Sequence, residues 1–367
     1  MKLDQLVWQN KDVGDYINDR FISLRFTSRD DEYKVVRAEY DLKVHPTALL
    51  LKADGMEIER ICGFDGQKDT YFQTFRDFTE GKYTLQTLLS EYERDPENLE
   101  MNYKIGRRYV DRRQEDQSPL YFTKVVELDP EDEYGYKTEA SYYIASHEAR
   151  RNKNPGPMQA FIASNTDERF LLSSYYDLVY YYMTMNKADQ VISTYEELLA
   201  KKPDHAPLMY SMASYIFYNT MEDRYARGVE LTNRAMELEP DRAVSGYYYL
   251  ARYYTNIKAF DKLTASYEEA LERWPENKTL MNFYAGDIHK NEIDSHYDRG
   301  IELIKKALDT QPEGAHFWYT LGWLYYKKGD KEEAVAAAKK AVEFMPTLKT
   351  YKDALDLFQK EDSFPRI

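Results

Sequence analysis

Apolar residues recur at helical spacing along most of the chain, and the helices that this spacing predicts come in pairs. Most pairs end in a similar phrase closed by proline, which cannot donate the next backbone hydrogen bond of a helix. Successive closing prolines lie 73, 37, 35, 37 and 34 residues apart, so the first gap holds two pairs. These residues are Pro130, Pro203, Pro240, Pro275, Pro312 and Pro346.

The pattern predicts about seven helical hairpins, followed by a capping helix over 350–360. Small residues such as Gly106, Ala334 and Ala341 stand where the two helices of a hairpin must approach closely. The expected fold class is therefore mainly α, an α-solenoid in which each hairpin packs on its neighbours. The predicted hairpins are 99–132, 133–168, 169–206, 207–243, 244–278, 279–314 and 315–348.

Three hairpins depart from the common pattern. The hairpins that end at Pro240 and Pro312 carry about two extra residues in the internal turn, within NTMEDRYARG and HKNEIDSHYDRG. Hairpin 133–168 has a short second helix after RRNKNPGP and lacks the closing proline. We therefore expect a bend or irregular packing in that hairpin.

The final hairpin, HFWYTLGWLYYKKGDKEEAVAAAKKAVEFMP, resembles the tetratricopeptide repeat. Trp318, Leu321, Gly322 and Tyr325 match packing positions of that family's first helix, and Pro346 matches its closing residue. Three earlier hairpins match at similar positions. The resemblance implies a right-handed superhelix whose concave groove holds a protein or a peptide.

The front of the chain predicts a small α/β domain over residues 1–82 and a linker helix over 83–98. Residues 2–19 favour a helix, a break near Asn10 and a second helix, and FISLRF (21–26) favours a strand. DDEYKVVRAEYDL favours a helix, and TALLLKA and EIERICG favour a strand hairpin turned at Asp54-Gly55. DTYFQTFRDFTEG favours a closing helix that Gly81 ends.

The stretch YDLKVHPTALLLKADGMEIERICGFDG resembles the second half of the thioredoxin fold. The resemblance implies that Pro46 is a cis-proline. Members of that family carry a Cys-x-x-Cys pair, whereas this chain has one cysteine, Cys62. Without a thiolate pair there is no nucleophile for disulfide exchange, so we expect no such catalysis by the chain as written.

The first strands of the thioredoxin fold have no counterpart in this sequence, and three outcomes stay open. The gap between FISLRF and TALLLKA stays open, the two strands slide together, or an upstream segment belongs there. The third is the origin that we favour, with a naturally degenerate domain as its rival. An unfilled gap would leave two strand edges with unpaired backbone groups.

Composition narrows the classes of function. A net charge of −14 argues against a nucleic-acid partner, whose phosphates the chain would repel. No apolar run approaches 18 residues and no signal-peptide core opens the chain, which predicts a soluble protein without membrane insertion. As written it reads as cytoplasmic, and a lost front segment would allow an extracytoplasmic or periplasmic location. The sequence does not predict the oligomeric state.

The 35 tyrosines suggest a binding surface on the first helices of the hairpins. Tyrosine offers a large, rigid contact area and a hydroxyl, and aromatic and arginine residues anchor interfaces. The alternative is that these rings only pack on one another. By register, the residues expected to line the concave groove are Tyr103, Arg107, Lys137, Tyr176, Tyr180, Tyr215, Tyr218, Tyr248, Arg252, Phe283, Tyr319, Trp323 and Tyr326.

Other candidate sites favour structural roles. We expect Cys62 to be a buried strand residue and His45 to stabilise a loop. His289 and His296 flank a turn together with acidic residues, and we expect them to be solvated turn residues, since tight metal-ligand spacing is missing. No metal and no cofactor is predicted.

The function expected from the sequence is that of a scaffold that binds a protein or peptide in an aromatic groove, with a redox-inactive thioredoxin-like module in front. The alternative is a thiol–disulfide oxidoreductase whose Cys-x-x-Cys segment is missing from this chain. A third interpretation is a purely architectural spacer without a groove ligand.

Overall fold

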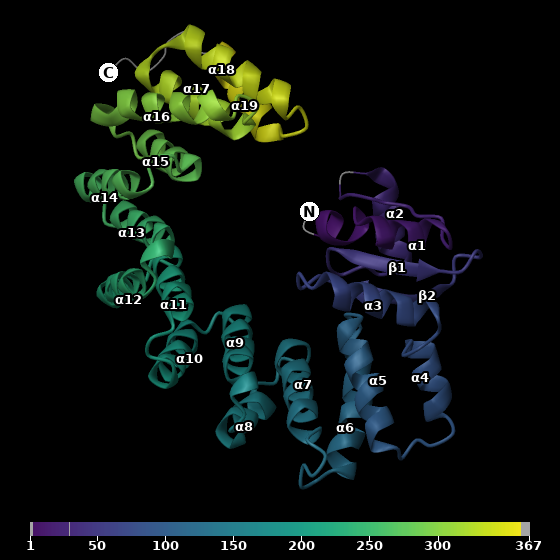
Figure 1. Cartoon of the computed structure of the whole chain (residues 1–367). Helices are drawn as coiled ribbons and strands as arrows, with labels where there is room; N and C mark the ends of the chain where they lie inside the picture. The colour runs from purple at the N-terminus through teal and green to yellow at the C-terminus, as the bar shows by residue number, and fades with distance from the viewer. Residues whose placement is uncertain (1–2, 29, 361–367) are drawn as a thin grey trace. The chain divides into compact units, whose positions relative to one another are not determined.

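The computed structural model describes residues 3–28 and 30–360, which are mainly helical (Figure 1). The chain forms two compact units, which we call unit 1 (residues 1–194) and unit 2 (residues 195–367). The boundary falls within helix α10 (Ala188–Lys201). Each unit is described separately below.

Unit 1 begins with short helices and two antiparallel strands. Asn10 caps the second of these helices by accepting from the backbone N–H groups of Asp12 and Val13, so the break expected near Asn10 is present. Strands β1 and β2 pair with Thr47 opposite Cys62, and Gly55 takes a positive φ in the turn. The elements are a π-helical turn (Asp4–Trp8), α1 (Lys11–Asn18), α2 (Asp31–Glu39), β1 (Thr47–Leu51), β2 (Glu57–Cys62) and α3 (Lys68–Thr79).

The expected thioredoxin-like domain is not confirmed. Residues 21–26 were predicted as a strand and form none. Ile22 and Leu24 in this segment are 94% and 77% exposed, so the segment buries little of its apolar surface within the described residues. The sheet has two strands in the described part of the chain. The peptide bond between His45 and Pro46 is cis.

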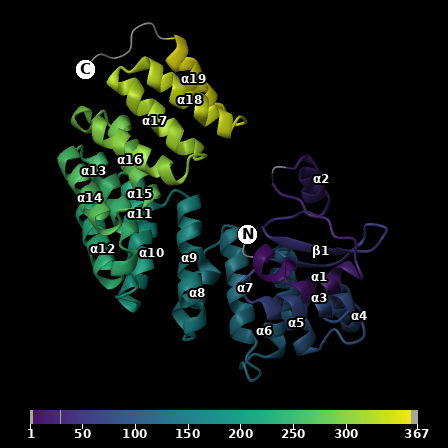
Figure 2. The same ribbon diagram turned by 45° about the horizontal axis from the view of Figure 1, so that its top comes forward.

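The rest of unit 1 consists of helices that pack on their neighbours in the chain. Figure 2 shows α5, α6 and α7 as successive neighbours. Helix α8 is short, as expected for hairpin 133–168. The helices are α4 (Leu85–Tyr92), α5 (Leu99–Asp111), α6 (Ser118–Leu128), α7 (Lys137–Arg150), α8 (Gly156–Ser164) and α9 (Glu168–Thr184).

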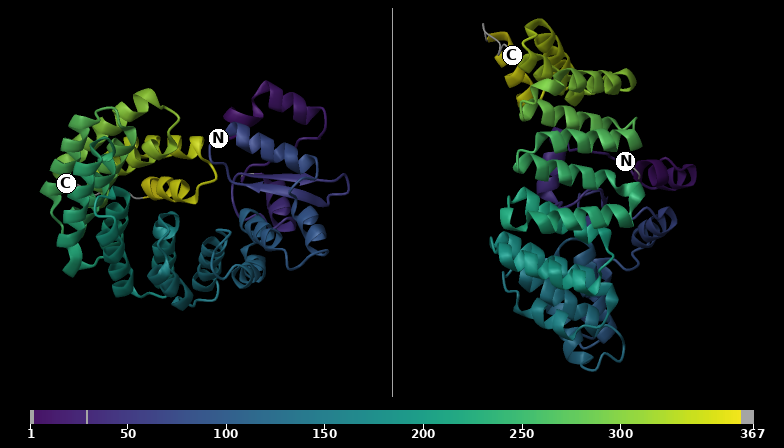
Figure 3. Two further views of the ribbon diagram at one scale, coloured as in Figure 1. Left: turned by 60° about the horizontal axis from the view of Figure 1, so that its bottom comes forward. Right: turned by 90° about the vertical axis from the view of Figure 1, so that its left-hand side faces the viewer.

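Unit 2 continues with four helical hairpins and a terminal helix, which follow one another as layers (Figure 3). Helix α19 packs on α18, as a capping helix would. The helices are α11 (Ala206–Tyr218), α12 (Tyr225–Leu238), α13 (Val244–Asn256), α14 (Phe260–Arg273), α15 (Lys278–Lys290), α16 (Tyr297–Thr310), α17 (Ala315–Lys328), α18 (Lys331–Phe344) and α19 (Lys349–Lys360).

Proline and the extra turn residues have the roles that the sequence suggests. Each closing proline lies two residues beyond the last residue of a second helix, as Pro203 does after α10 and Pro346 after α18. The extra residues before α12 and α16 form short 3₁₀ turns, Glu222–Arg224 and Asp294–His296. A third such turn, Glu115–Gln117, precedes α6 and was not predicted.

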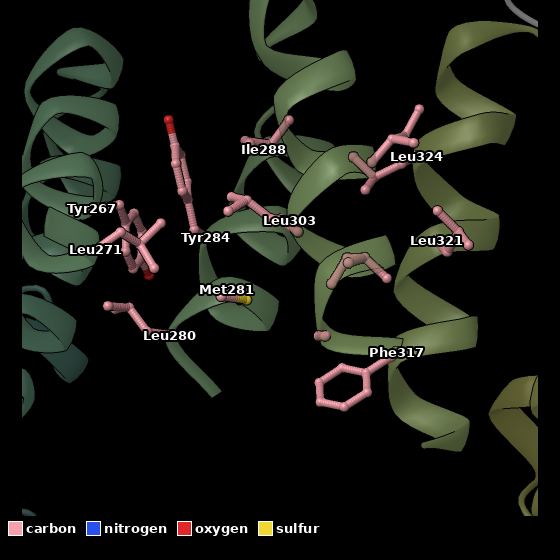
Figure 4. Packing of buried hydrophobic residues seen from close by; sticks show 14 of the residues in the cluster. Tyr267, Leu271, Leu280, Met281, Tyr284, Ile288, Leu303, Phe317, Leu321 and Leu324 are labelled. Atoms are coloured by element: carbon pink, nitrogen blue, oxygen red, sulfur yellow. The ribbon is translucent and has the colours of Figure 1, made fainter. Parts of the chain in front are cut away.

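The core consists of residues that each hairpin shares with the next. Leu280, Tyr284 and Ile288 on α15 are fully buried between α14, α16 and α17 (Figure 4). Small residues allow this close packing: a Cβ placed on Gly228 would lie 2.7 Å from the ring of Phe217. Ala334 is fully buried, as expected for a residue at which two helices approach closely.

A buried network of charged side chains joins the strand hairpin to the first helical hairpin. Glu59 on β2 is fully buried and accepts hydrogen bonds from the Leu85 backbone N–H at 2.6 Å and from Arg108 Nε at 3.2 Å. Its other oxygen is paired with Arg112, which also donates to Glu57 at 2.7 Å. Burial opposes ionisation of Glu57, but its hydrogen bonds and its charged arginine partners outweigh burial and lower its pKa.

Removal of the buried charge of Glu59 should loosen the front of unit 1. The E59Q substitution leaves two arginines facing a neutral amide, and breaking a buried pair in this way costs about 3–5 kcal/mol. We expect faster hydrogen–deuterium exchange in peptides that cover 47–62. The E93Q variant, which neutralises an exposed carboxylate, should exchange like the parent chain. Equal exchange rates in all three proteins would show that the network does not hold the strands.

Two glycines in unit 2 offer a matched test of helix packing. In G228A the new methyl group meets the Phe217 ring, which should destabilise the chain by about 1–3 kcal/mol. In G286A the nearest atom to the new methyl group is Lys290 Nζ at 4.0 Å, so the helix propensity of alanine should raise stability by up to about 1 kcal/mol. Urea unfolding followed by circular dichroism measures both, and shifts of the same sign would contradict the packing described.

Candidate functional site

The residues predicted to line a groove all lie on the first helices of their hairpins. In unit 1 they occupy α5, α7 and α9, and in unit 2 they occupy α11, α13, α15 and α17. Their surroundings differ from one hairpin to the next. Among the aromatic residues of this set, Tyr218, Phe283 and Tyr180 are the most exposed, at 62%, 49% and 48%.

In unit 1 a polar network ties α5 to α7. The Tyr103 hydroxyl donates to Glu139 Oε2 at 2.9 Å, and its ring stacks on Tyr136 with centroids 4.3 Å apart. Arg107 is paired with the same Glu139 carboxylate and with the Tyr143 hydroxyl. Burial and the hydrogen bond to Glu139 raise the pKa of Tyr103. These side chains therefore use their polar groups within the protein.

A second network in unit 1 joins α7 to α9. The Asp177 carboxylate is fully buried and accepts from Arg150 Nε at 2.5 Å and from the Tyr142 hydroxyl at 3.3 Å. The Arg150 guanidinium lies 5.2 Å from the centre of the Tyr180 ring. Tyr176 is half-buried on α9. Lys137 donates to the Pro130 carbonyl oxygen in the connection between α6 and α7.

In unit 2 four of the predicted residues form two contacting pairs over α11, α13 and α15, and because Tyr248 and Arg252 are four residues apart on one helix we call the set the aromatic strip. It consists of Tyr218, Arg252, Tyr248 and Phe283. The Arg252 guanidinium lies 5.2 Å from the centre of the Tyr218 ring. The rings of Tyr248 and Phe283 lie with centroids 4.8 Å apart. Tyr215 lies half-buried one turn before Tyr218.

Arg252 is the polar group at the centre of the aromatic strip. Its Nε atom is buried and has no hydrogen-bond partner in the described part of the chain. A buried donor without an acceptor is costly, but this atom has no exposed surface and is not itself a contact point for a ligand. The strip therefore offers exposed aromatic surface beside a half-buried guanidinium.

The last hairpin is less accessible than the sequence suggests. The capping helix α19 places Phe358 with its ring centre 5.0 Å from Trp323 and 4.8 Å from Tyr326. Tyr326 is only 7% exposed as a result, and Tyr319 stacks on Tyr351 at 4.8 Å. Tyr326 is therefore a core residue and not a groove residue, because the capping helix covers this face.

The expectation that His289 is a solvated turn residue is wrong. It is 7% exposed on α15 and stacks on Trp323, with ring centres 5.8 Å apart and an interplanar angle of 6°. Burial lowers the pKa of His289 to about 3, and the charges of Lys290 and Lys327 act in the same direction. The neighbouring Asp287 accepts from the Tyr267 hydroxyl at 2.7 Å.

The other candidates have structural surroundings. Cys62 is half-buried on β2, and burial raises the pKa of its thiol, which disfavours the reactive thiolate. His45 Nε2 lies 2.6 Å from the Tyr33 hydroxyl. Within residues 3–28 and 30–360, no group of acidic, histidine or cysteine side chains is arranged to hold a metal ion. The same residues contain no helix long and apolar enough to cross a bilayer.

Sequence reasoning missed the carboxylates that organise unit 1. Glu139 and Asp177 each bind an arginine from the neighbouring first helix. Asp177 stands at a position where the helical pattern predicts a buried residue, and a charged residue is rarely buried. This conflict between position and residue type is the sequence signal that could have revealed the network. It points to a buried polar network, because a buried carboxylate needs partners.

Burial of His289 should make unit 2 sensitive to acid. The unfolded imidazole takes up a proton near pH 6.5, whereas the folded one does so only near pH 3, so its stabilisation is complete above pH 6.5 and is lost as the pH falls. Replacement by phenylalanine, an apolar ring that does not titrate, removes this effect. The loss of stability between pH 6.5 and 5 should be smaller in H289F by up to about 2 kcal/mol. Parallel urea-unfolding profiles against pH would contradict this.

Comparison with known proteins identifies the repeat directly in one region. A family model described as a tetratricopeptide repeat matches residues 294–349, which hold α16, α17 and α18. The human mitochondrial import receptor subunit TOM70 is 19% identical over 165 residues, a match that covers 43% of this chain and 26% of the relative. The chain thus spans about a quarter of the length of that relative.

Solved structures with similar folds are also repeat proteins. A tetratricopeptide repeat protein from Parabacteroides merdae is 14% identical, with 71% of this chain and 99% of that chain covered and a TM-score of 0.46. A thermophilic repeat protein of the same kind from Thermus thermophilus is 17% identical, with 51% and 98% covered and a TM-score of 0.39. Likenesses at this level carry no argument about ligands. Residues 294–349 therefore match the tetratricopeptide repeat, and the other helical hairpins of the chain have the same two-helix form.

Proposed function

We propose that the chain is a binding scaffold and that the aromatic strip of unit 2 holds an extended peptide segment of a partner protein. The observation that carries this proposal is the combination of exposed aromatic rings with an arginine beside them. Tyr218 and Phe283 are 62% and 49% exposed, and the half-buried Arg252 has its guanidinium over the Tyr218 ring.

The chemistry of the strip suits a peptide. Aromatic side chains bury a large area at a low cost in rotamer entropy, and tyrosine adds a hydroxyl for hydrogen bonding. Every residue of an extended peptide presents a backbone carbonyl, so the segment can supply an acceptor to Arg252 whatever its sequence. Apolar side chains of the peptide would pack on Tyr218 and Phe283.

Unit 1 fits this role less well. Tyr103, Arg107 and Arg150 already have partners in the protein, so a ligand would have to compete with those contacts. Desolvation of polar groups that are already paired costs free energy on binding. The proposal therefore places the binding surface in unit 2 and assigns the networks of unit 1 to holding neighbouring hairpins together.

A peptide-display selection on the intact chain tests the proposal. Selected peptides should bind the parent chain, and the Y218A/F283A double variant should lose at least about ten-fold in affinity, because both exposed anchors of the strip are gone. Isothermal titration calorimetry measures the change. Both residues are exposed enough that the helices should stay folded, and circular dichroism checks that they do.

The matched control is Y134A. Tyr134 is 67% exposed in the connection before α7 and lies outside the strip. Its removal should leave the dissociation constant within about two-fold. If Y134A weakens binding as much as Y218A/F283A does, the peptides recognise exposed tyrosine in general and the proposed surface is wrong. Unchanged binding in both variants refutes the proposal equally.

A further inference from the structure

Two hollows lie on the second-helix side of unit 2, away from the aromatic strip. The first lies between α10, α11 and α12 and has a volume of about 710 Å³. The second lies between α14, α15 and α16 and has a volume of about 210 Å³. The residues that line them correspond at a constant offset of 72 positions, as Glu196 does to Glu268 and Arg227 does to Arg299.

The offset extends over a longer stretch of the sequence. Residues 195–240 and 267–312 align without a gap, from a shared YEE to a shared proline. Several fully buried positions nevertheless differ between the two segments, such as Phe217, whose counterpart is His289. A partly exposed set of one arginine and two glutamates is the same in both hollows. Other buried positions are identical, such as Leu208 and Leu280, so both the core and the ionic set of each hollow are kept between the two segments.

The ionic residues form the same frame in each hollow. Arg227 Nε and Nη2 donate to the two oxygens of Glu196 at 2.9 and 2.8 Å, and Arg299 donates to Glu268 at the same two distances. Each arginine also pairs with a glutamate three residues further along its own helix, at 2.9 Å. Such two-pronged pairs fix the orientation of a carboxylate. The carboxylates of both hollows are therefore held in place before any partner arrives.

The junction between the two hollows lacks this frame. Asn233 takes the place of the glutamate at positions 196 and 268, and Lys262 takes the place of the arginine at positions 227 and 299. Gly246 replaces the methionine that lies at the floor of each hollow, and the side chain of Met236 packs directly against it. The two hollows described here are therefore separated by a junction with a different set of residues.

The charge and floor of each hollow indicate what fits there. Three carboxylates and two cations line each one, and a further carboxylate, Asp204 or Glu276, binds one of the cations from outside. Leucine and methionine side chains form the floor of both hollows, such as Met209 and Met281. Each hollow thus has one carboxylate more than it has cations, although Arg227 and Arg299 already pair with glutamates there. This small negative excess around an apolar floor suits a lysine or arginine next to an apolar side chain.

We propose that the second-helix face of residues 196–306 is a two-site docking surface for a basic partner segment, with one lysine- or arginine-flanked apolar anchor in each hollow. Two linked anchors bind more tightly than either alone, because the second contact forms at a high effective concentration. The proposal does not depend on the aromatic strip, since the two surfaces use different helices and different chemistry.

The test measures binding of a synthetic peptide to the intact chain. The peptide has two Lys-Leu-Leu-Lys clusters joined by a Gly-Ser linker and is prepared with several linker lengths. E230Q and E302Q each remove the exposed glutamate of one hollow and leave the other arginine–glutamate pair in place. Each single variant should weaken binding about ten-fold, and E230Q/E302Q should reduce it below detection. Fluorescence anisotropy at low ionic strength measures the dissociation constants, and circular dichroism confirms folding.

The control variant E197Q/E313Q removes the same charge at exposed positions outside the hollows. It should change the dissociation constant less than about two-fold, and a peptide with glutamate in place of lysine should not bind. The proposal is overturned if the control variant weakens binding as much as E230Q/E302Q. It is also overturned if the parent chain does not bind the lysine peptide at any linker length, or if it binds the glutamate peptide equally well.

Discussion

A helical hairpin cannot bury its apolar surface by itself, and this constraint organises most of the molecule. Each hairpin completes its core only against the next one, so small residues must stand where helices touch and large ones must fill the space beside them. Gly228 against Phe217 is one such contact. The last hairpin has no further repeat, and α19 covers its face with Phe358, which is 1% exposed.

The same constraint decides which surfaces remain for binding. Packing uses the layer between the helices of neighbouring hairpins and leaves the outer sides of the first and second helices free. In unit 1 the first-helix side is occupied by paired charges such as Arg150 with Asp177. In unit 2 the same side carries exposed Tyr218 and Phe283. The two units therefore share a hairpin architecture and differ in what their first helices offer.

The periodic part of the fold could be predicted from the sequence, because the same spacing of apolar residues and closing prolines occurs in successive hairpins. Helix pairs, closing prolines and the capping helix follow from spacing and residue type alone. Spacing and residue type could not decide whether residues 21–26 form a strand, because an alternating apolar segment becomes a strand only if a neighbouring strand pairs with it. The thioredoxin-like domain is not confirmed, and its prediction was weak for the same reason: its sheet depends on partners that are distant in sequence.

The sequence predicted which helices carry the candidate residues, but it could not predict how exposed those residues are. Helical spacing placed the predicted groove residues on the first helices. It could not show that α19 covers Tyr326 or that Arg107 forms an ion pair with Glu139. Those outcomes depend on contacts between hairpins. The two hollows could not be predicted from the single-hairpin pattern, because the residues that line them match at an offset of 72, which is twice the period of a hairpin. The match gains meaning only when the structure shows that the corresponding residues line similar hollows.

The most direct test of the central claim is site-specific photo-crosslinking to a selected peptide. p-Benzoylphenylalanine would be placed singly at positions 218, 283 and 134 of the intact chain. If packing between hairpins leaves the aromatic strip as the binding surface, crosslinks form from positions 218 and 283 and not from position 134. Crosslinks from position 134 alone, or equal yields from all three positions, would contradict the account.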